Sequence, residues 1–553
     1  MPRNIIITFV LAAGLVAAGR AQQPASIASL KTTAEASDYK STSTYDDVVR
    51  FMKTVADASP LIYYTTYGTT YEGRAMPMAV VGTGLKDASA ASVRATGKLR
   101  VHIQGNIHAG EVEGKEAAQI LLREFALGQH AEWLQSTVFL ITPIFNADGN
   151  EKFALTNRPR QNGPINGMGT RANGQSLNIN RDFTKLETPE ARAFAKLWTD
   201  YDPHVGFDLH TSDGSTHGYY LTYSPPLNPD TSDRIMKILT DEWFPFVTKD
   251  VKARHGWDMF YYGNASSPGG RGGRAGGRGF SADPTGTPPT AGAMRAWRTF
   301  EHVPRFHNNY VGLRNRFGLL SEAYAYATFE DRIKATNYFL ESALEFAHTH
   351  AAELKQAVEA ADRESIVGRT LGTRARIKTG GTVDILMGEV EDEVNPLNGA
   401  VMNRRKDVVK VEKMTDQMWF EPTTTETVPA EFYVPAAATK AIDLLRAHGV
   451  TIRQLTQPVK GVEAFAITSN TARPARQSID FGMHELRTIE GEWKPAPEVT
   501  VPAGAFAVPM NQPLARLAFY LLAPTSDDGV LNWNMLDDLL PEGTTVYPIY
   551  RKK

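Results

Sequence analysis

The chain has 553 residues, of which 59 are Lys or Arg and 61 are Asp or Glu, so its formal charge at pH 7 is −2. A chain of this length predicts two or three domains, and its near-neutral charge argues against nucleic-acid binding, which needs a concentrated basic face. The sequence contains no cysteine, which excludes disulfides, thiolate metal ligands and a cysteine nucleophile.

The first 21 residues have the organisation of a secretory signal peptide. Arg3 precedes the uncharged, mostly apolar residues 5–18, and small residues follow at positions 19 and 21. This order of basic, apolar and small residues is typical of a cleaved export signal. The apolar run of 14 residues is too short to span about 30 Å of hydrocarbon. We therefore expect cleavage after residue 21, no membrane span, and a mature protein in the periplasm or outside the cell.

Apolar runs alternate with amphipathic stretches between about residues 75 and 360. The runs predict strands and the amphipathic stretches predict helices, one of which begins at Thr188-Pro189 with a capping residue and a first-turn proline. The predicted strands are 75–82, 99–104, 137–145, 204–209, 219–223 and 317–326, and the predicted helices are 112–126, 190–200 and 331–361. The alternation indicates an α/β fold with a mixed central sheet flanked by helices. Chemistry in such folds gathers at the carboxyl ends of strands.

Two further segments differ in composition from this main domain, which we place at residues 35–365. Residues 269–279 read GGRGGRAGGRG inside a Gly-, Arg- and Pro-rich stretch at about 264–293, which predicts a flexible surface insertion. Residues 370–553 contain short β-like runs and one helical stretch at 436–448. We expect one or two smaller β-rich domains there, with a structural role.

Three side chains are candidate metal ligands. His108 and Glu111 follow the predicted strand 99–104, where the chain turns into a helix, and His210 ends the strand 204–209. Two histidines and a carboxylate form an open catalytic zinc site when water takes the fourth position. A second His-x-x-Glu pair, His350 and Glu353, lies in a polar-faced helix with no third ligand nearby in the sequence, and we interpret it as a solvated helix face.

Five sequence blocks, in order, resemble the zinc carboxypeptidases of the carboxypeptidase A type over about residues 40–360. His-Ala-Gly-Glu at 108–111 is similar to the first metal motif of that family, and Asp-Leu-His at 208–210 is similar to its third-ligand strand. Residues 143–149 resemble its Pro-x-x-Asn-Pro-Asp-Gly turn, with Ala147 in place of the second proline. Residues 177–183 resemble its Asp-Leu-Asn-Arg-Asn-Phe segment except at Asn178 and Asp182. Residues 319–322 resemble the strand of its catalytic glutamate.

The resemblance implies one Zn²⁺ per chain and a peptide substrate with a free C-terminal carboxylate. Glu322 would be the general base that takes a proton from water and passes it to the leaving amine. Burial in its apolar strand would raise the pKa of this carboxyl. Asn180 and Arg181 look like the pair that holds the substrate carboxylate, to which a guanidinium can donate two parallel bonds. Asp208 and Asn178 would orient the ligands.

The family resemblance implies two further roles, and the candidate residues for them lie outside the five blocks. Arg171 lies nine residues before Asn180, the spacing at which related carboxypeptidases place an arginine that supports the oxyanion. Arg158 and Arg160 are its rivals. Tyr310 is a candidate for the family's mobile tyrosine. Two alternatives keep the fold: a zinc amidohydrolase acting on cell-wall peptides or acyl-amino acids, and a non-catalytic binding protein.

Overall fold

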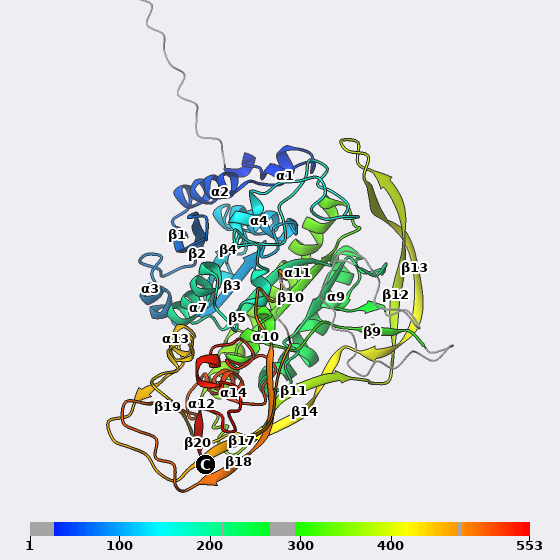
Figure 1. The fold of residues 1–553 in the computed structure, drawn as a ribbon. Coiled ribbons are helices and arrows are strands. Elements are labelled where there is room, and N and C mark those ends of the chain that lie inside the picture. Colours follow the sequence, from blue (N-terminus) through cyan, green and yellow to red (C-terminus); the bar gives the residue numbers. More distant parts are fainter. Residues whose placement is uncertain (1–26, 213, 266–293, 474–477) are drawn as a thin grey trace, which may run out of the picture.

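The computed structural model describes residues 27–212, 214–265, 294–473 and 478–553 (Figure 1). The expected signal peptide lies outside the described residues. So does the expected insertion at about 264–293, apart from Asn264 and Ala265, which form strand β8.

An eight-stranded mixed sheet lies at the centre of the main domain, in the order β1-β2-β4-β3-β5-β10-β6-β7. Strand β3 is parallel to β4 and β5, and β5 is parallel to β10, whereas β1, β2 and β6 join the sheet by antiparallel pairing. The strands are β1 (Ile62–Thr69), β2 (Ala75–Val81), β3 (Leu99–Gly105), β4 (Thr137–Thr142), β5 (Val205–Ser212), β6 (Leu221–Ser224), β7 (Met259–Tyr261) and β10 (Phe317–Tyr324). The predicted α/β class with a mixed sheet is confirmed.

Helices cover both faces of this sheet, and β4 and β5 are therefore buried at every position. One face packs against α2 (Tyr45–Ala58), α4 (Glu113–Ala126), α5 (Trp133–Ser136), α9 (Phe244–His255), α11 (Phe329–Thr349) and α12 (Ala351–Arg363). The other face packs against α3 (Ala90–Ala95), α7 (Pro189–Tyr201) and α10 (His307–Leu313). Shorter helices are α1 (Thr33–Ala36), α6 (Ala147–Asn150), α8 (Asp233–Lys237), the 3₁₀ turns η1 (Ile27–Ser29), η2 (Ile179–Arg181) and η4 (Asp537–Leu539), and the π-helical η3 (Ile238–Trp243).

Local sequence explains the helices beside the strand ends. Thr188 caps α7 by accepting a hydrogen bond from Ala191 N–H, and Pro189 occupies the first turn, as the sequence predicts. A Cβ at Gly114, near the start of α4, would lie 2.6 Å from Leu209 Cβ. Only glycine therefore lets α4 approach β5 this closely, and the residues just before α4 come to lie beside the end of β5.

The predicted closing helix at 331–361 is two helices, α11 and α12. The break falls at His350, whose backbone is not helical (φ −110°, ψ 17°). Its N–H donates to the Phe346 carbonyl, and its ring stacks on the Phe346 ring at 3.9 Å. Glu353 is exposed. This second His-x-x-Glu pair lies on a helix junction, away from the metal-ligand cluster of the described residues.

The C-terminal region is β-rich, as predicted, with further sheets and two helices. A long hairpin, β12–β13, runs along the side of the main domain (Figure 1) and extends the pair β8–β9, while β11 pairs with β14 and six strands form the last sheet. The elements are β9 (Ala296–Arg298), β11 (Thr370–Lys378), β12 (Thr382–Val394), β13 (Val401–Gln417), β14 (Trp419–Thr427), β15 (Glu431–Val434), α13 (Thr439–Ala447), β16 (Arg453–Gln454), β17 (Val462–Ala472), β18 (Arg487–Ala496), β19 (Phe506–Pro509), α14 (Ala515–Leu522) and β20 (Tyr550–Lys552).

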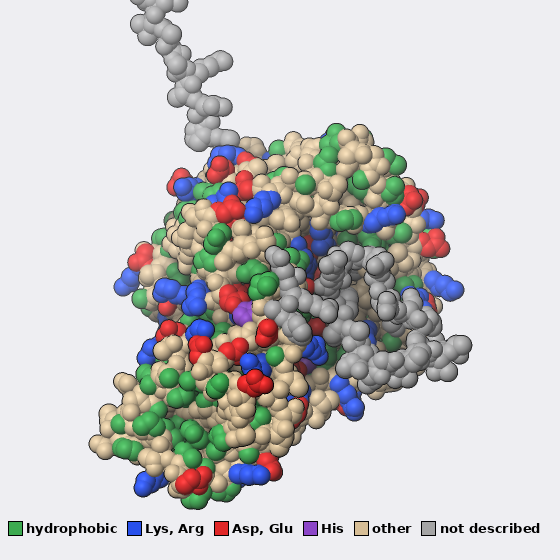
Figure 2. Space-filling view, in the orientation of Figure 1, with side chains coloured by type: hydrophobic (Ala, Val, Ile, Leu, Met, Phe, Trp, Pro, Cys, Tyr) green, Lys and Arg blue, Asp and Glu red, His purple; other side chains and the backbone are tan. Residues whose placement is uncertain are grey.

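The main domain and the C-terminal region share one hydrophobic core. A single cluster of buried side chains joins Leu313 of α10 to Leu371, Phe432 and Phe519 of the C-terminal region. Figure 2 shows acidic and basic side chains along the surface where the upper and lower parts of the molecule meet. No helix among the described residues is both long and apolar enough to cross a membrane.

Candidate metal centre

Three parallel strands, β3, β5 and β10, bring the candidate site together. Their carboxyl ends lie at one edge of the sheet. His108 is on the loop that follows β3, His210 lies near the end of β5, and Glu322 lies near the end of β10. Residues far apart in the sequence therefore meet at the edge where α/β folds carry their chemistry.

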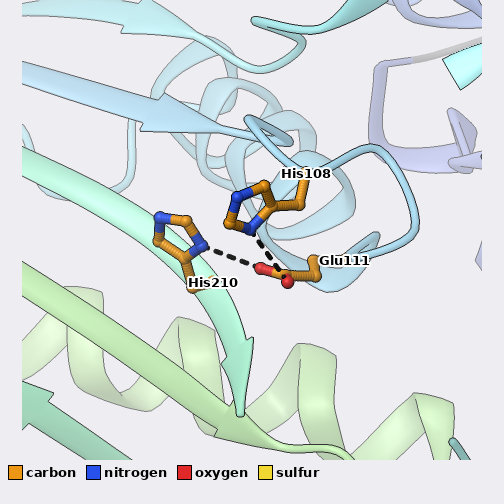
Figure 3. A group of neighbouring side chains, drawn as sticks. All are labelled: His108, Glu111 and His210. Carbon is orange, nitrogen blue, oxygen red and sulfur yellow. Dashed lines mark hydrogen bonds and ion pairs between the residues drawn. The ribbon is translucent and has the colours of Figure 1, made fainter. Parts of the chain in front are cut away.

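His108, Glu111 and His210 converge on one point, as Figure 3 shows. Nδ1 of His108 lies 3.0 Å from Oε1 of Glu111, and Nδ1 of His210 lies 2.8 Å from Oε2 of the same carboxylate. All three side chains are buried, and their ligand atoms lie within 4.8 Å of one another. Each histidine therefore presents the same ring nitrogen to a shared carboxylate.

The second ring nitrogen of each histidine, Nε2, contacts a further side chain. Nε2 of His108 lies 3.0 Å from Oδ1 of Asn178, and Nε2 of His210 lies 2.8 Å from Oδ2 of Asp208. Gln104 donates from Nε2 to Oδ1 of Asp208 at 3.2 Å. Such partners set the tautomer of a metal-binding imidazole and fix the orientation of its ring. The expected roles of Asp208 and Asn178 thus have a geometric basis.

The charges in this cluster favour a bound cation. Burial and the neighbouring Arg171 guanidinium lower the pKa of His108 to about 3, so its ring is neutral. Burial raises the pKa of Glu111, but His108 and Arg158 outweigh it and hold that pKa well below its usual range. Burial lowers the pKa of His210, whereas the carboxylates of Asp208 and Glu111 raise it well above 6.5. A metal ion would replace the proton between Nδ1 of His210 and Glu111, while Asp208 would still accept the proton on Nε2.

The donor set fits Zn²⁺. Two imidazole nitrogens and one carboxylate are the protein ligands of many catalytic zinc sites, in which the fourth position is left for water or substrate. The sequence predicted these three residues, and the structure brings them together. They are the one group of three or more possible ligand side chains that lies close enough to hold a metal among the described residues.

Two of the three candidate arginines lie at this centre. Arg158 Nη1 donates to Glu111 Oε1 at 3.0 Å, and its Nη2 donates to the Thr211 carbonyl. Arg171 Nη1 lies 3.2 Å from His108 Nδ1 and 3.6 Å from Glu111 Oε1. Arg160 instead contacts Asp392 of β12, so the structure does not bring it to the site.

Gly110 allows Arg158 to cross the ligand loop. A Cβ at position 110 would lie 2.7 Å from Arg158 Cγ and 2.9 Å from the Gly169 carbonyl oxygen. Asn146 supports the same loop by donating from Nδ2 to the Ile107 carbonyl at 3.2 Å. The first two sequence blocks therefore form one packed unit around the ligands.

Asn180 lies beside the ligand His210, and Arg181 contacts Asn180 and Phe306. Asn180 Nδ2 is 3.4 Å from His210 Nε2. The Arg181 guanidinium lies over the Phe306 ring at 3.7 Å and donates to the Asn180 carbonyl at 2.6 Å. Burial and the Arg171 charge lower the pKa of Arg181 to about 9, which leaves the guanidinium charged at neutral pH. A stacked arginine of this kind is held ready for a carboxylate.

The structure does not bring Tyr310 to the metal centre, which corrects the sequence expectation. Its side chain is fully buried in the core, and its hydroxyl contacts His448 Nδ1 at 2.8 Å and accepts from Arg314 at 3.0 Å. The tyrosine instead ties α10 to α13 of the C-terminal region.

The C-terminal region reaches the site through a contact that the sequence did not predict. Asn178 donates from its backbone N–H to the Ile479 carbonyl and from Nδ2 to Asp480 Oδ1, both at 2.6 Å. Residues 478–484 carry no motif that signals this contact. The residue that Asp480 touches, Asn178, is one of the two positions at which its block departs from the family pattern.

A buried His-Glu-His centre at the carboxyl edge of an α/β sheet is an arrangement that suits a catalytic zinc site. Residues 48–217 match the family described as zinc carboxypeptidase. Carboxypeptidase 2 of Trichophyton rubrum is 23% identical over 546 residues, which cover 94% of this chain and 88% of the relative. Probable carboxypeptidase 2 of Arthroderma benhamiae is 28% identical over 183 residues, which cover 32% of this chain and 30% of the relative.

Among solved structures, the carboxypeptidase A of Helicoverpa armigera is similar with a TM-score of 0.40 and 12% identity, covering 59% of this chain and 75% of that one. A metallo-carboxypeptidase from Burkholderia cenocepacia has a TM-score of 0.38 and 17% identity, covering 56% of this chain and 70% of that one. The family match over residues 48–217 and the nearly full-length relative support a metallocarboxypeptidase of the zinc carboxypeptidase family.

Proposed function

We propose that this protein is a metallocarboxypeptidase, which binds one Zn²⁺ through His108, Glu111 and His210 and hydrolyses the last peptide bond of a peptide with a free C-terminus. The convergence of both Nδ1 atoms on Glu111, at 3.0 and 2.8 Å, carries the proposal. When bound there, zinc lowers the pKa of a coordinated water and polarises the scissile carbonyl. The other tasks fall to side chains of the protein.

Glu322 acts as the general base. It takes a proton from the attacking water and delivers it to the leaving amine, which must depart protonated. Its position supports this role, because Glu322 of β10 is registered with the ligand His210 of β5, and registered residues of adjacent strands project from the same face of a sheet.

Arg171 stabilises the developing oxyanion. A tetrahedral oxyanion is favoured by a fixed cation at the place where its charge forms. The Arg171 guanidinium is one-third exposed and lies 3.6 Å from Glu111, so it borders both the ligands and solvent. Arg158 is more buried and is tied to the Glu111 carboxylate, which fits a role in holding that ligand.

Asn180 and Arg181 hold the substrate's terminal carboxylate. Among the described residues, the guanidinium of Arg181 donates one hydrogen bond, to the Asn180 carbonyl, and its face rests on Phe306. Its other N–H groups can serve a carboxylate through charge-assisted bonds. Recognition of a free carboxylate is what restricts cleavage to the last residue.

Export of the enzyme is also part of the proposal. Its support is the sequence of residues 1–21, with a basic start, a short apolar run and a small-residue exit. Sequencing the N-terminus of protein secreted from its native cells tests it, and an intact Met1 would contradict cleavage after residue 21.

The proposed activity is tested by incubating the mature protein with a mixed peptide library, with and without a zinc chelator, and analysing the products by mass spectrometry. We expect loss of single C-terminal residues, blocked by the chelator and restored by zinc. Intact peptides together with one bound zinc per chain would instead support the amidohydrolase alternative. Intact peptides with no bound zinc would support the non-catalytic alternative.

A further inference from the structure

A loop of the C-terminal region lies directly behind the metal ligand His108. This loop, residues 478–484, lies between β17 and β18 in the sequence and contains a bridge between Ser478 and Gly482. The Ile479 carbonyl accepts a hydrogen bond from the backbone of Asn178. Asp480 is 6% exposed and accepts a 2.6 Å hydrogen bond from the side chain of Asn178.

These contacts form a chain from the C-terminal region to the metal site. Asp480 Oδ1 accepts from Asn178 Nδ2 at 2.6 Å, and Asn178 Oδ1 lies 3.0 Å from His108 Nε2. The same Oδ1 accepts from the Asn180 N–H at 3.1 Å. His108 presents its opposite nitrogen, Nδ1, to Glu111. Asp480 is therefore one amide group away from a metal ligand.

The order of donors and acceptors in this series of hydrogen bonds fixes the tautomer of His108. A carboxylate only accepts, so Asp480 keeps Nδ2 of Asn178 on its own side and turns Oδ1 toward His108. Oxygen atoms face both ring nitrogens, Glu111 Oε1 at Nδ1 and Asn178 Oδ1 at Nε2. When a metal lies between Nδ1 and Glu111, the ring proton sits on Nε2, where Asn178 Oδ1 accepts it, and Nδ1 keeps the lone pair that the metal needs. Arg171 Nη1, which can only donate, lies 3.2 Å from Nδ1 and agrees with this tautomer. A reversed amide would place the proton on the wrong nitrogen.

The contact with Asp480 falls at position 178, where the sequence departs from the family block. The family block that residues 177–183 resemble begins with aspartate, and this chain has Asn178 instead. A free asparagine can offer either its oxygen or its NH₂ group to an imidazole, whereas a carboxylate offers only oxygen. Here the Asn180 N–H, which donates to Oδ1, and Asp480, which accepts from Nδ2, favour the same orientation of the amide. Asp480 restores the direction and the negative charge from a segment that lies 302 positions further along the chain.

We propose that Asp480 is a positioning residue of the metal centre, which orients Asn178 and thereby His108, so that metal binding depends on a carboxylate from the C-terminal region. This inference rests on the proposed zinc site. Outer hydrogen-bond partners of metal ligands affect metal affinity by about 10–100-fold. The C-terminal region then has a role in the chemistry beyond packing.

The test is a carboxylate swap between positions 178 and 480, with zinc affinity measured by competition against a chelator. Asp480→Asn is isosteric and leaves the backbone contact at Ile479 in place, and we expect it to weaken zinc binding about 10-fold. Asn178→Asp in combination with Asp480→Asn puts the carboxylate directly against His108 and should restore most of the affinity. Asn178→Asp alone places two carboxylates in contact and should also weaken binding.

Glu485→Gln is the matched control, because it removes the same charge from an exposed position next to the loop, and we expect wild-type affinity. Wild-type affinity in Asp480→Asn would overturn the proposal. So would a double variant that binds zinc no better than Asp480→Asn, since a purely structural contact would show no rescue by the swap. Absence of zinc binding in the wild-type protein would refute the proposed site itself, so the two failures are distinguishable.

Discussion

Glu322 of β10 lies directly opposite His210 of β5 in the parallel register of the two strands. The pairing continues on both sides, with Leu320 opposite Asp208 and Tyr324 opposite Ser212. Side chains alternate between the faces along a strand, so Asp208, His210 and Glu322 project from one face. The pairing of β5 with β10 therefore places the ligand His210, its orienting partner Asp208 and the proposed base Glu322 on the same face of the sheet.

We expect Glu322→Gln to reduce kcat about 1,000-fold, within the range of general-base effects, and to leave the zinc content unchanged. The amide keeps the shape of the side chain but does not take up a proton. Steady-state kinetics and metal analysis of the purified variant are the measurements. Glu353→Gln, in the exposed second His-x-x-Glu pair, is the control and should be fully active. Normal turnover by the Glu322 variant would remove this residue from the mechanism.

Replacement of Arg181 should impair binding of free carboxylates. We expect Arg181→Ala to raise KM for peptides with a free C-terminus about 10–100-fold, which corresponds to the loss of charge-assisted hydrogen bonds. Arg181→Lys should be intermediate, because a lysine keeps the charge but not the planar fork. Arg160→Ala serves as the control, since Arg160 contacts Asp392 outside the metal centre. An equal KM for all three variants and the wild type would favour the amidohydrolase alternative.

We expect substitutions of Arg171 and Arg158 to affect different quantities, kcat in the first case and zinc affinity in the second. Arg171→Met should lower kcat about 100-fold and leave zinc affinity near the wild-type value. Arg158→Met should weaken zinc binding, because Arg158 joins Glu111 to the Thr211 carbonyl and holds that ligand in place. Kinetics combined with zinc titration distinguish the two effects. The reverse pattern, with zinc lost in the Arg171 variant and only kcat lost in the Arg158 variant, would exchange the proposed roles.

Six of the eight strands of the central sheet, all except β1 and β7, and the three ligands could be predicted because their signals are local. Continuous apolar runs predicted the strands that carry the site, and each ligand lies at or just after the end of such a run. Helix α9 was not predicted, because it follows the π-helical stretch Ile238–Trp243, which interrupts the regular helical period. The long helix predicted at 331–361 was wrong at His350, where an aromatic contact with Phe346 accompanies a break.

The contacts of the C-terminal region could not be predicted, because they join distant parts of the chain without a motif. Asp480 accepts a hydrogen bond from Asn178, and the ring of His448 contacts the hydroxyl of Tyr310. The family resemblance suggested a mobile role for Tyr310, whereas packing against α13 buries it. Nothing in the spacing of these residues indicates that they meet, since only the folded chain brings their segments together.

Removal of residues 370–553 should abolish folding as well as activity. Leu371, Phe432 and Phe519 belong to the same buried cluster as Leu313 of the main domain, and their loss would expose a large apolar surface. We expect the truncated chain to be insoluble, or to lack the near-ultraviolet circular dichroism of fixed aromatic packing. A soluble truncated protein with full peptidase activity would contradict both the shared core and the proposed role of Asp480.

An ion pair that anchors residues 478–484 should make stability depend on pH. His484 Nε2 lies 2.5 Å from Glu187 Oε1. Burial lowers the pKa of His484, but Glu187 outweighs burial and raises that pKa above 6.5. Burial raises the pKa of Glu187, but His484 outweighs it and lowers that pKa below 4.5. The pair therefore stabilises the fold most between about pH 4.5 and 6.5, and the histidine contribution is lost as pH rises through its raised pKa.

A double-mutant cycle with His484→Gln and Glu187→Gln isolates the interaction of this pair. At pH 6 we expect a coupling free energy of about 0.5–1 kcal/mol, the range for a partly exposed pair, from denaturant unfolding of the two single variants, the double variant and the wild type. At pH 9 the coupling should be smaller, because the charge of His484 is lost as pH rises through its raised pKa. The sign follows from the raised pKa of the histidine, so a coupling that grew between pH 6 and pH 9 would contradict the assignment of a charged pair.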